Sequence, residues 1–312
     1  SREKMLDKLE VVDKPAEIND KMNIELNPSV ISGNDVLSVS HLSKAFDDNT
    51  LFTDISFDIK RGERVALIGN NGTGKTTILK IINDILPADS GEIKLGSKVT
   101  IGYYDQEHHV LDPDKTLFDE LQDAYPDLNN TQIRNTLAAF LFTNDDVFKY
   151  IRDLSGGERG RVSLAKLMLS NANFLILDEP TAGLDPKERV RFRNLISAFA
   201  KNRIVILSTH IVSDVEFIAE EIIMMKSGQI IHFGEPQEIT SEINGQVWEC
   251  IVPAAHAERY AASFNTSNLR NTDRGETILR IISDRPPMEN AVKVQPNLED
   301  LYLFYFKGDT EE

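Results

Sequence analysis

Cysteine is nearly absent from this chain, and long apolar stretches are absent altogether. Cys250 is the single cysteine among 312 residues. One cysteine cannot form an internal disulfide, which suits a reducing compartment and predicts a cytoplasmic protein. No run approaches the ~18 consecutive apolar residues that a membrane-spanning helix needs. Ser1–Asp20 is dense in charge, so no secretory signal is expected.

Positive charge is also scarce. The chain carries 34 Lys and Arg against 50 Asp and Glu, a net charge of −16. This charge repels phosphate backbones, so DNA is not expected as a partner and extended nucleic-acid contact is disfavoured, although one bound nucleotide is not. The hydrophobic share of 41% is ordinary for a globular protein. The length allows one large α/β domain with smaller additions.

The hydrophobic pattern divides the chain into three parts. Residues 1–35 are predicted to be a linker helix remnant, Ser1–Lys14, followed by a polar connector. Because the sequence does not start with Met, we expect its natural beginning to lie upstream. Residues 36–240 are predicted to form one α/β domain with a helical insert at about 112–170. Residues 241–312 are predicted to form a small accessory α/β module.

Apolar runs in the middle part predict a parallel sheet that is covered on both faces. Phe174–Leu177 and Ile204–Leu207 are apolar throughout, as doubly buried strands are. Alternation at Val36–Val39 and Ile55–Ile59 predicts half-exposed strands. The other predictions are strands at 64–68 and 99–103, helices at 76–85 and 158–170, and a hairpin joining 222–225 to 229–233.

Two further helices and two strands are expected toward the end. Asp185-Pro186 predicts a helix start with a capping residue and a first-turn proline. The buried stripe of that helix is predicted to contain Val190, Leu195, Ile196 and Phe199. The accessory module is predicted to contain strands at 248–252 and 277–282 and a final helix at 297–306 capped by Asn297.

A glycine-rich loop between a predicted strand and a predicted helix carries the strongest chemical signal. It fits the pattern G-x-x-x-x-G-K-[ST] and consists of Gly69, Asn70, Asn71, Gly72, Thr73, Gly74, Lys75 and Thr76, with Thr77 next to it. Glycines let backbone N–H groups turn inward around phosphate oxygens, and the helix adds its positive N-terminal end. Lys75 is placed to reach the β- and γ-phosphates, and Thr76 offers a hydroxyl to Mg²⁺. The pattern predicts Mg-ATP binding.

Two acidic residues end the apolar run at Phe174–Leu177. Asp178 is expected to hold Mg²⁺, and Glu179 is the candidate general base for an attacking water. Strand ends are where ligands bind in such sheets. Alone, the pair would fit an acidic helix cap equally well, but the upstream loop favours the catalytic interpretation.

Leu154–Glu158 precedes another predicted helix. Ser155, Gly156 and Gly157 could hold a γ-phosphate at the start of that helix. Ser155 could equally cap the helix, with Glu158 in the reciprocal capping position. Both interpretations can be true at once.

The order of these motifs resembles the ATP-binding cassette superfamily over about 36–241. Leu154–Glu158 matches the signature sequence of that family letter for letter, and Ala182–Asp185 matches its D-loop. The resemblance implies that Gln106 is the Q-loop glutamine, which contacts Mg²⁺ and relays to a partner, and that His210 is the switch histidine that steadies the γ-phosphate and the attacking water. It also implies that Phe46 stacks on adenine, where many members have Tyr.

The resemblance also implies a P-loop NTPase fold and a second cassette as partner. In this family two cassettes face each other head to tail, and each ATP lies between the loop of one and the signature of the other. The chain shows one loop and one signature. Without the family context, Gln106 would be considered a surface glutamine, Phe46 a core residue and His210 a buried histidine.

The two halves of the chain resemble different branches of the family. Residues 1–180 resemble the second cassette of the F subfamily, the translation factors that act on ribosomes, as in Ile101–Gln106. Residues 181–312 resemble the ATPase subunit of an exporter, as in Ala182–Pro186 and Ser208–His210. One hypothesis is that two cassette genes were joined near Leu177–Thr181, and the alternative is one divergent lineage. The expected partner is a membrane permease at the inner face of the membrane, or alternatively the ribosome.

Overall fold

The computed structural model describes residues 30–104, 111–200, 202–216 and 218–306. The predicted helix at Ser1–Lys14 and the Q-loop residue Gln106 lie outside these ranges. Among the described residues, no helix is long and apolar enough to cross a bilayer.

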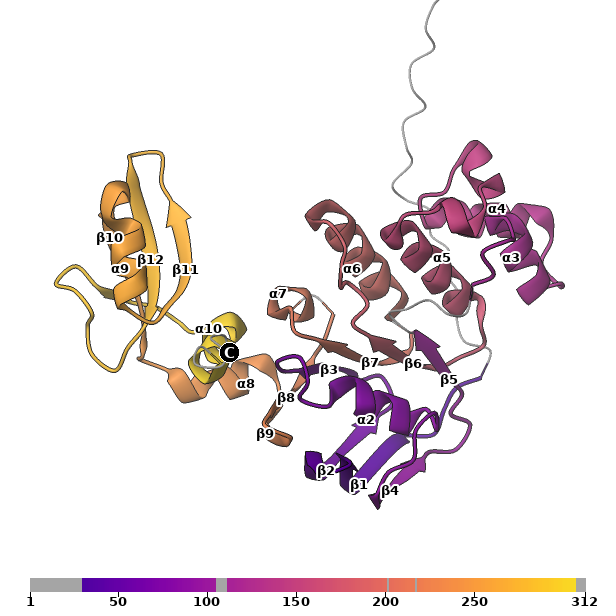
Figure 1. Cartoon of the computed structure of the whole chain (residues 1–312), viewed down its shortest axis with the longest axis horizontal. Coiled ribbons are helices and arrows are strands. Elements are labelled where there is room, and N and C mark those ends of the chain that lie inside the picture. The colour runs from indigo at the N-terminus through magenta and orange to yellow at the C-terminus, as the bar shows by residue number, and fades with distance from the viewer. Residues whose placement is uncertain (1–29, 105–110, 201, 217, 307–312) are drawn as a thin grey trace, which may run out of the picture.

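The centre of the molecule is a six-stranded sheet with the strand order β5-β6-β7-β3-β8-β9 (Figure 1). Five strands are parallel and β9 pairs antiparallel with β8. The strands are β3 (Arg64–Ile68), β5 (Ile101–Tyr104), β6 (Phe174–Asp178), β7 (Ile204–Thr209), β8 (Glu221–Lys226) and β9 (Gln229–Gly234). The fully apolar runs therefore form the buried parallel strands, as the sequence predicted.

A three-stranded antiparallel sheet packs beside the central sheet and encloses a second core with helix α2 (Lys75–Ile82) (Figure 1). Its strands are β1 (Asp35–Phe46), β2 (Asn49–Lys60) and β4 (Ser90–Leu95). Helix α2 ends at Ile82, whereas the sequence predicted Ile85. Asp84 has a φ of 56°, a left-handed conformation that a helix cannot continue through.

The helical insert covers one end of the central sheet. It contains α3 (Leu117–Ala124), α4 (Asn130–Ala139), two short 3₁₀ turns, η1 (Asn144–Phe148) and η2 (Ile151–Asp153), and α5 (Gly156–Leu169). Helices α6 (Pro186–Ala200) and α7 (Val212–Val215) follow. Their apolar faces share one large core with the sheet, so residues on both sides of Thr181 pack together.

The predicted buried stripe of α6 is wrong at one position. Val190 is 45% exposed, and the fully buried residues are Phe192, Ile196 and Ala200. Leu195 and Phe199 pack against the core as predicted. The helix is rotated so that Phe192 contacts Tyr104 of the edge strand β5, with ring centroids 5.9 Å apart. Which apolar residue faced the sheet could not be decided from spacing alone.

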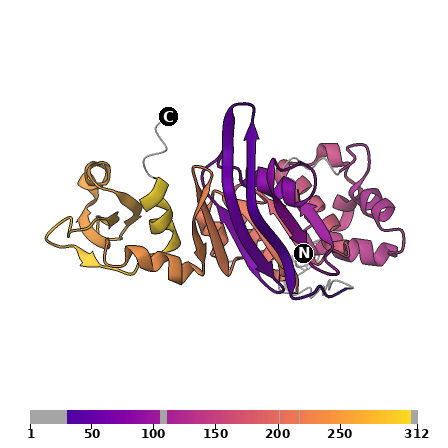
Figure 2. The same ribbon diagram turned by 90° about the horizontal axis from the view of Figure 1, so that it is seen from below.

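The last part of the chain is a four-stranded antiparallel sheet with small helices (Figure 2). It contains α8 (Pro236–Thr240), the turns η3 (Ser241–Ile243) and η4 (Ala254–His256), β10 (Val247–Pro253), α9 (Ala257–Ser263), β11 (Thr266–Asn271), β12 (Glu276–Ile282), β13 (Val292–Lys293) and α10 (Leu298–Phe306). The strands β10 and β12 and the helix α10, capped by Asn297, match the predictions. Sequence reasoning missed β11, β13 and α9.

Replacing Phe192 by Ala is expected to lower the free energy of unfolding by about 3–5 kcal/mol, because it empties a site that is only 1% exposed. Urea unfolding of the whole chain measures this change. The neighbouring Val190→Ala variant is the control and should stay within about 0.5 kcal/mol of the parent. Equal losses in the two variants would contradict the orientation of α6.

Candidate functional site

The phosphate loop is shaped by two positions where only glycine fits. The loop joins the end of β3 to the start of α2, the strand–loop–helix context that the motif requires. Gly74 has a φ of 98°, and a Cβ there would lie 2.7 Å from the Phe52 ring. A Cβ at Gly69 would overlap the Met225 carbonyl oxygen at the end of β8. The loop is therefore clamped between β2 and β8.

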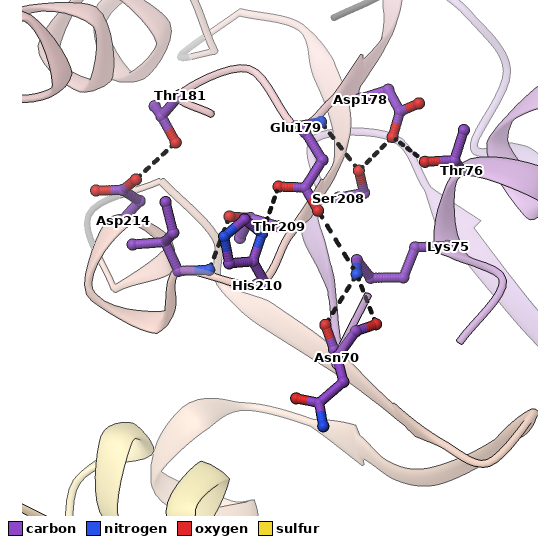
Figure 3. A network of polar contacts seen from close by, with 12 residues as sticks. Asn70, Lys75, Thr76, Asp178, Glu179, Thr181, Ser208, Thr209, His210 and Asp214 are labelled. Atoms are coloured by element: carbon purple, nitrogen blue, oxygen red, sulfur yellow. Dashed lines mark hydrogen bonds and ion pairs between the residues drawn. The ribbon is translucent and has the colours of Figure 1, made fainter. Parts of the chain in front are cut away.

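Lys75 is buried, with 4% exposure, and its ammonium group lies inside the loop (Figure 3). It donates to the carbonyl oxygens of Gly69, at 2.8 Å, and Asn70, at 3.1 Å. Its Nζ also lies 3.5 Å from Oε1 of Glu179. Burial lowers the pKa of Lys75, and the attraction of Glu179 opposes that shift. A phosphate group entering the loop would replace carbonyl oxygens with stronger, charged acceptors.

Asp178 lies at the end of β6 and accepts two hydroxyl hydrogen bonds on one oxygen. Oγ1 of Thr76 donates to its Oδ1 at 3.0 Å, and Oγ of Ser208 donates to the same atom at 2.6 Å. A hydroxyl beside a carboxylate supplies the hard oxygen ligands that Mg²⁺ prefers. No group of three His, Cys, Asp or Glu side chains forms a complete metal cage in the described ranges. Thr76 and Asp178 thus fit a Mg²⁺ ion whose other ligands would include phosphate oxygens of the nucleotide.

Glu179 is held at both of its carboxylate oxygens. Oε1 faces Lys75, and Oε2 lies 3.0 Å from Nδ1 of His210, which follows β7 (Figure 3). Its backbone N–H donates to Oγ of Ser208 at 3.0 Å. Glu179 is 8% exposed and has a φ of 44°, a strained conformation for a residue with a side chain. The structure thus places the predicted base and the predicted switch histidine in direct contact.

Lys75, Thr76, Glu179 and His210 line one cavity of about 300 Å³. Its lining consists of Leu51, Asn71, Gly72, Gly74, Lys75, Thr76, Thr77, Glu179, Ala182 and His210. The loop, the residue after strand β6 and the residue after β7 therefore meet at one edge of the sheet, where ligands of parallel sheets bind. Sequence reasoning did not assign Leu51 or Ala182 to this site.

The signature residues and Phe46 do not line this cavity. Ser155 caps α5 by accepting from the backbone N–H of Glu158 at 3.2 Å, and Glu158 reciprocates, so the capping interpretation is confirmed. A Cβ at Gly156 would contact nothing within 4 Å, so its packing does not require glycine. Phe46 lies at the end of β1 and is 47% exposed. The phosphate-binding role of Ser155, Gly156 and Gly157 and the adenine-stacking role of Phe46 stay predictions.

Ser208 is a site residue that the sequence analysis did not single out. Its buried hydroxyl joins the Mg²⁺ candidate Asp178 to the backbone of the base candidate Glu179. A second buried pair, Thr181 Oγ1 donating to Asp214 at 2.6 Å, ties the segment after Glu179 to α7. The available signal for Ser208 was its position directly after the apolar run Ile204–Leu207, on the same sheet edge as Asp178.

Comparison with known proteins finds related ATP-binding proteins. Residues 52–182 match the family model described as ABC transporter. The ATP-binding protein YdiF of Bacillus subtilis is 48% identical over 186 residues, which cover 59% of this chain and 29% of YdiF. The energy-dependent translational throttle protein EttA of Escherichia coli is 37% identical over 185 residues, covering 58% of this chain and 33% of EttA. The chain spans about a third of the length of these curated relatives.

Solved structures give the same result for the fold. CbiO1 of Clostridium perfringens, part of the ABC transporter complex cbiONQ, is 26% identical with a TM-score of 0.56, and the match covers 67% of this chain and 92% of cbiO1. The dimeric ATP-binding cassette MJ0796, bound to ADP and Pi, has a TM-score of 0.56 at 21% identity, covering 64% of this chain and 98% of MJ0796. The fold and the site define a P-loop ATPase cassette. The chain contains an ATP-binding cassette domain, and its relatives and solved neighbours are consistent with the ATP-binding cassette superfamily.

Replacing Ser208 by Ala is expected to raise the Mg²⁺ concentration needed for half-maximal nucleotide binding by about tenfold or more, since Asp178 loses the shorter of the two hydroxyl hydrogen bonds that orient Oδ1. Binding of AMP-PNP at increasing MgCl₂ measures this. Ser170→Ala removes a hydroxyl that bonds only near its own helix end and serves as the control. An unchanged Mg²⁺ requirement in the Ser208 variant would show that Ser208 does not orient Asp178 for the metal.

Proposed function

We propose that the chain hydrolyses Mg-ATP to ADP and phosphate and uses the reaction to drive a conformational cycle. The observation that carries this proposal is the contact chain Lys75–Glu179–His210 at one cavity, with Thr76 in the same cavity lining and hydrogen-bonded to the buried Asp178 behind it. Phosphoryl transfer to water needs positioning and charge stabilisation more than covalent chemistry. This site supplies a cation, a carboxylate base and a hydroxyl–carboxylate pair for a metal.

The geometry supports a specific order of events. Lys75 is shared between loop carbonyls and Glu179 in this structure. The β- and γ-phosphates of ATP compete for its ammonium group, which frees Oε1 of Glu179 to accept a proton from the attacking water. His210 keeps the other oxygen in place. Thr76 and Asp178, together with the predicted ligand Gln106, would hold Mg²⁺, which would neutralise phosphate charge when bound.

A second cassette is the proposed partner that completes the site. The signature residues Ser155, Gly156 and Gly157 are separate from the cavity that holds the loop. Ser155 and Gly156 are exposed, so they are accessible to another copy or to a related cassette. The cassette MJ0796, which shares this fold, has been solved as a dimer. ATP would then lie between the loop of one cassette and the signature of the other.

We propose that the cycle energises a membrane exporter. One match covers 92% of the cbiO1 chain, a cassette that is part of an ABC transporter complex. In this proposal the partner is a membrane permease, and the cassette binds it at the inner face of the membrane. The net charge of −16 also disfavours extended RNA contact.

A ribosomal role is the second candidate. The observation that favours it is the 37% identity to EttA, a translational throttle protein, over 58% of this chain. This identity exceeds the 26% identity to cbiO1, although the match covers only 33% of EttA. In this alternative, ATP binding would change the state of the ribosome or a tRNA.

Glu179→Gln is expected to lower the turnover of ATP by about 10²–10⁴-fold while Mg-ATP still binds, because the amide cannot accept the proton. Lys75→Ala is expected to weaken Mg-ATP binding by at least about tenfold, since a charged donor to phosphate is lost. Lys94, an exposed lysine paired with Glu92, provides the control Lys94→Ala, which should change neither quantity. Parent-like hydrolysis by Glu179→Gln would remove Glu179 from the mechanism.

The two candidate partners are separated by one pull-down. The Glu179→Gln variant, held in Mg-ATP, is expected to co-purify with an integral membrane protein from detergent extracts, because the ATP-bound state accumulates. Lys75→Ala is the matched control that should recover less of this partner. Co-sedimentation of Glu179→Gln with ribosomes, without any membrane protein, would instead support the ribosomal role.

A further inference from the structure

The C-terminal helix α10 reaches the phosphate loop of the same chain. The phenol of Tyr302 donates a hydrogen bond to Oδ1 of Asn70 at 2.8 Å, across 232 positions of sequence. Asn70 is the loop residue whose backbone carbonyl also accepts from Lys75. Its main chain therefore faces the phosphate cradle while its side chain faces the accessory module.

Helix α10 is anchored firmly enough to hold that contact. Leu298, Leu301 and Phe306 are buried in the main core together with residues of α7 and β8. The Tyr302 ring packs on the Phe306 ring, with centroids 4.4 Å apart. Lys226, at the end of β8, donates to the carbonyl oxygen of Tyr305 and lies 5.5 Å from the Phe306 ring centroid.

The same helix is bound to the four-stranded sheet on another face. Asp300 is fully buried and accepts from Nε and Nη2 of Arg280 on β12, at 3.0 and 2.8 Å. It also accepts from Oγ of Ser267 on β11 at 2.6 Å. Helix α10 lies between that sheet and the cassette in both views (Figures 1 and 2). One short helix thus connects the accessory sheet to the nucleotide loop.

We propose that Tyr302 is a positioning residue for nucleotide binding, and that through it the accessory sheet and the phosphate loop influence each other. This inference rests on the proposed binding of Mg-ATP at the loop. Tyr302 fixes the side chain of Asn70 and so holds the loop in the shape that receives phosphates before the nucleotide arrives. Linkage requires the reverse effect as well, so bound nucleotide stabilises the docking of α10.

The test removes one oxygen atom. Tyr302→Phe keeps the ring that packs on Phe306 and deletes the hydrogen bond to Asn70. Its Kd for Mg-AMP-PNP, measured by calorimetry on the whole chain, is expected to rise about threefold to tenfold. The KM for ATP should rise in parallel, while kcat at saturation stays within about twofold of the parent.

Tyr305→Phe is the matched control on the same helix. The Tyr305 phenol donates to Oε1 of Glu242 at 2.6 Å and does not touch the loop. Burial, aided by this hydrogen bond, raises the pKa of Tyr305 to about 12, so its phenol stays a donor at neutral pH. Removing this hydroxyl should leave the Kd unchanged. An equal loss of affinity in both variants would overturn the proposal.

A double-mutant cycle identifies the route of the effect. In an Asn70→Ala background, Tyr302→Phe should have no further effect on the Kd, because its acceptor is already gone. A Kd for Tyr302→Phe equal to that of the parent, or an effect that persists without the Asn70 side chain, would refute the role of Tyr302. If the parent itself does not bind Mg-AMP-PNP, the proposed function fails first and this inference fails with it.

Hydrogen exchange on the unmutated chain tests the reverse direction and does not depend on a variant folding. Saturating Mg-AMP-PNP is expected to slow amide exchange in Leu298–Phe306 by about threefold or more. Opening of α10 breaks the contact between Tyr302 and Asn70 and so weakens nucleotide binding, which makes opening less favourable when nucleotide is bound. The largely exposed strand β4, which belongs to the three-stranded antiparallel sheet, provides the internal control. Unchanged exchange in α10 at saturation would contradict the coupling.

Discussion

The ammonium group of Lys75 has been withdrawn from water, and the rest of the site is arranged around that burial. The loop carbonyls of Gly69 and Asn70 and the carboxylate of Glu179 compensate for the lost hydration. A buried cation without such partners would be strongly destabilising. These carbonyl and carboxylate groups would lose their contacts with Lys75 if phosphates entered the loop. Lys75 would therefore exchange these partners only for a ligand of comparable negative charge.

The partners of Lys75 come together because the parallel strands of the central sheet end at the same edge. Parallel strands β6, β7 and β3 present Asp178, the residues Ser208 and His210 and the phosphate loop at one end of the sheet. Ser208 then binds Asp178 and the backbone of Glu179 together. The loop is clamped from outside by Phe52 and by the backbone of Met225. Because β8 also carries Lys226, which bonds to α10, the accessory module is connected to the clamp as well as to Asn70.

Much of the fold was predictable because its signals are local. The fully apolar strands, the strand–loop–helix around Gly69–Thr76, the start of α6 at Pro186 and the cap of α10 at Asn297 each follow from a few adjacent residues. Local signals failed where two faces of an element were both apolar. In α6 they predicted that Val190 was buried and did not identify Phe192, because only the position of Tyr104 decides which face meets the sheet.

The sequence by itself was enough to predict the chemistry: the glycine-rich loop indicates a nucleotide site, and the acidic pair after an apolar strand and the histidine after the next strand are the residues expected to hold magnesium and activate water, since each follows directly from a local pattern beside the loop. Tertiary structure decided which groups touch. In the folded chain His210 contacts Glu179, and Ser208 donates to Asp178. The signature residues lie outside the loop cavity, and Tyr302 donates to Asn70. No local pattern encodes these contacts, because each depends on how distant elements pack against a shared core.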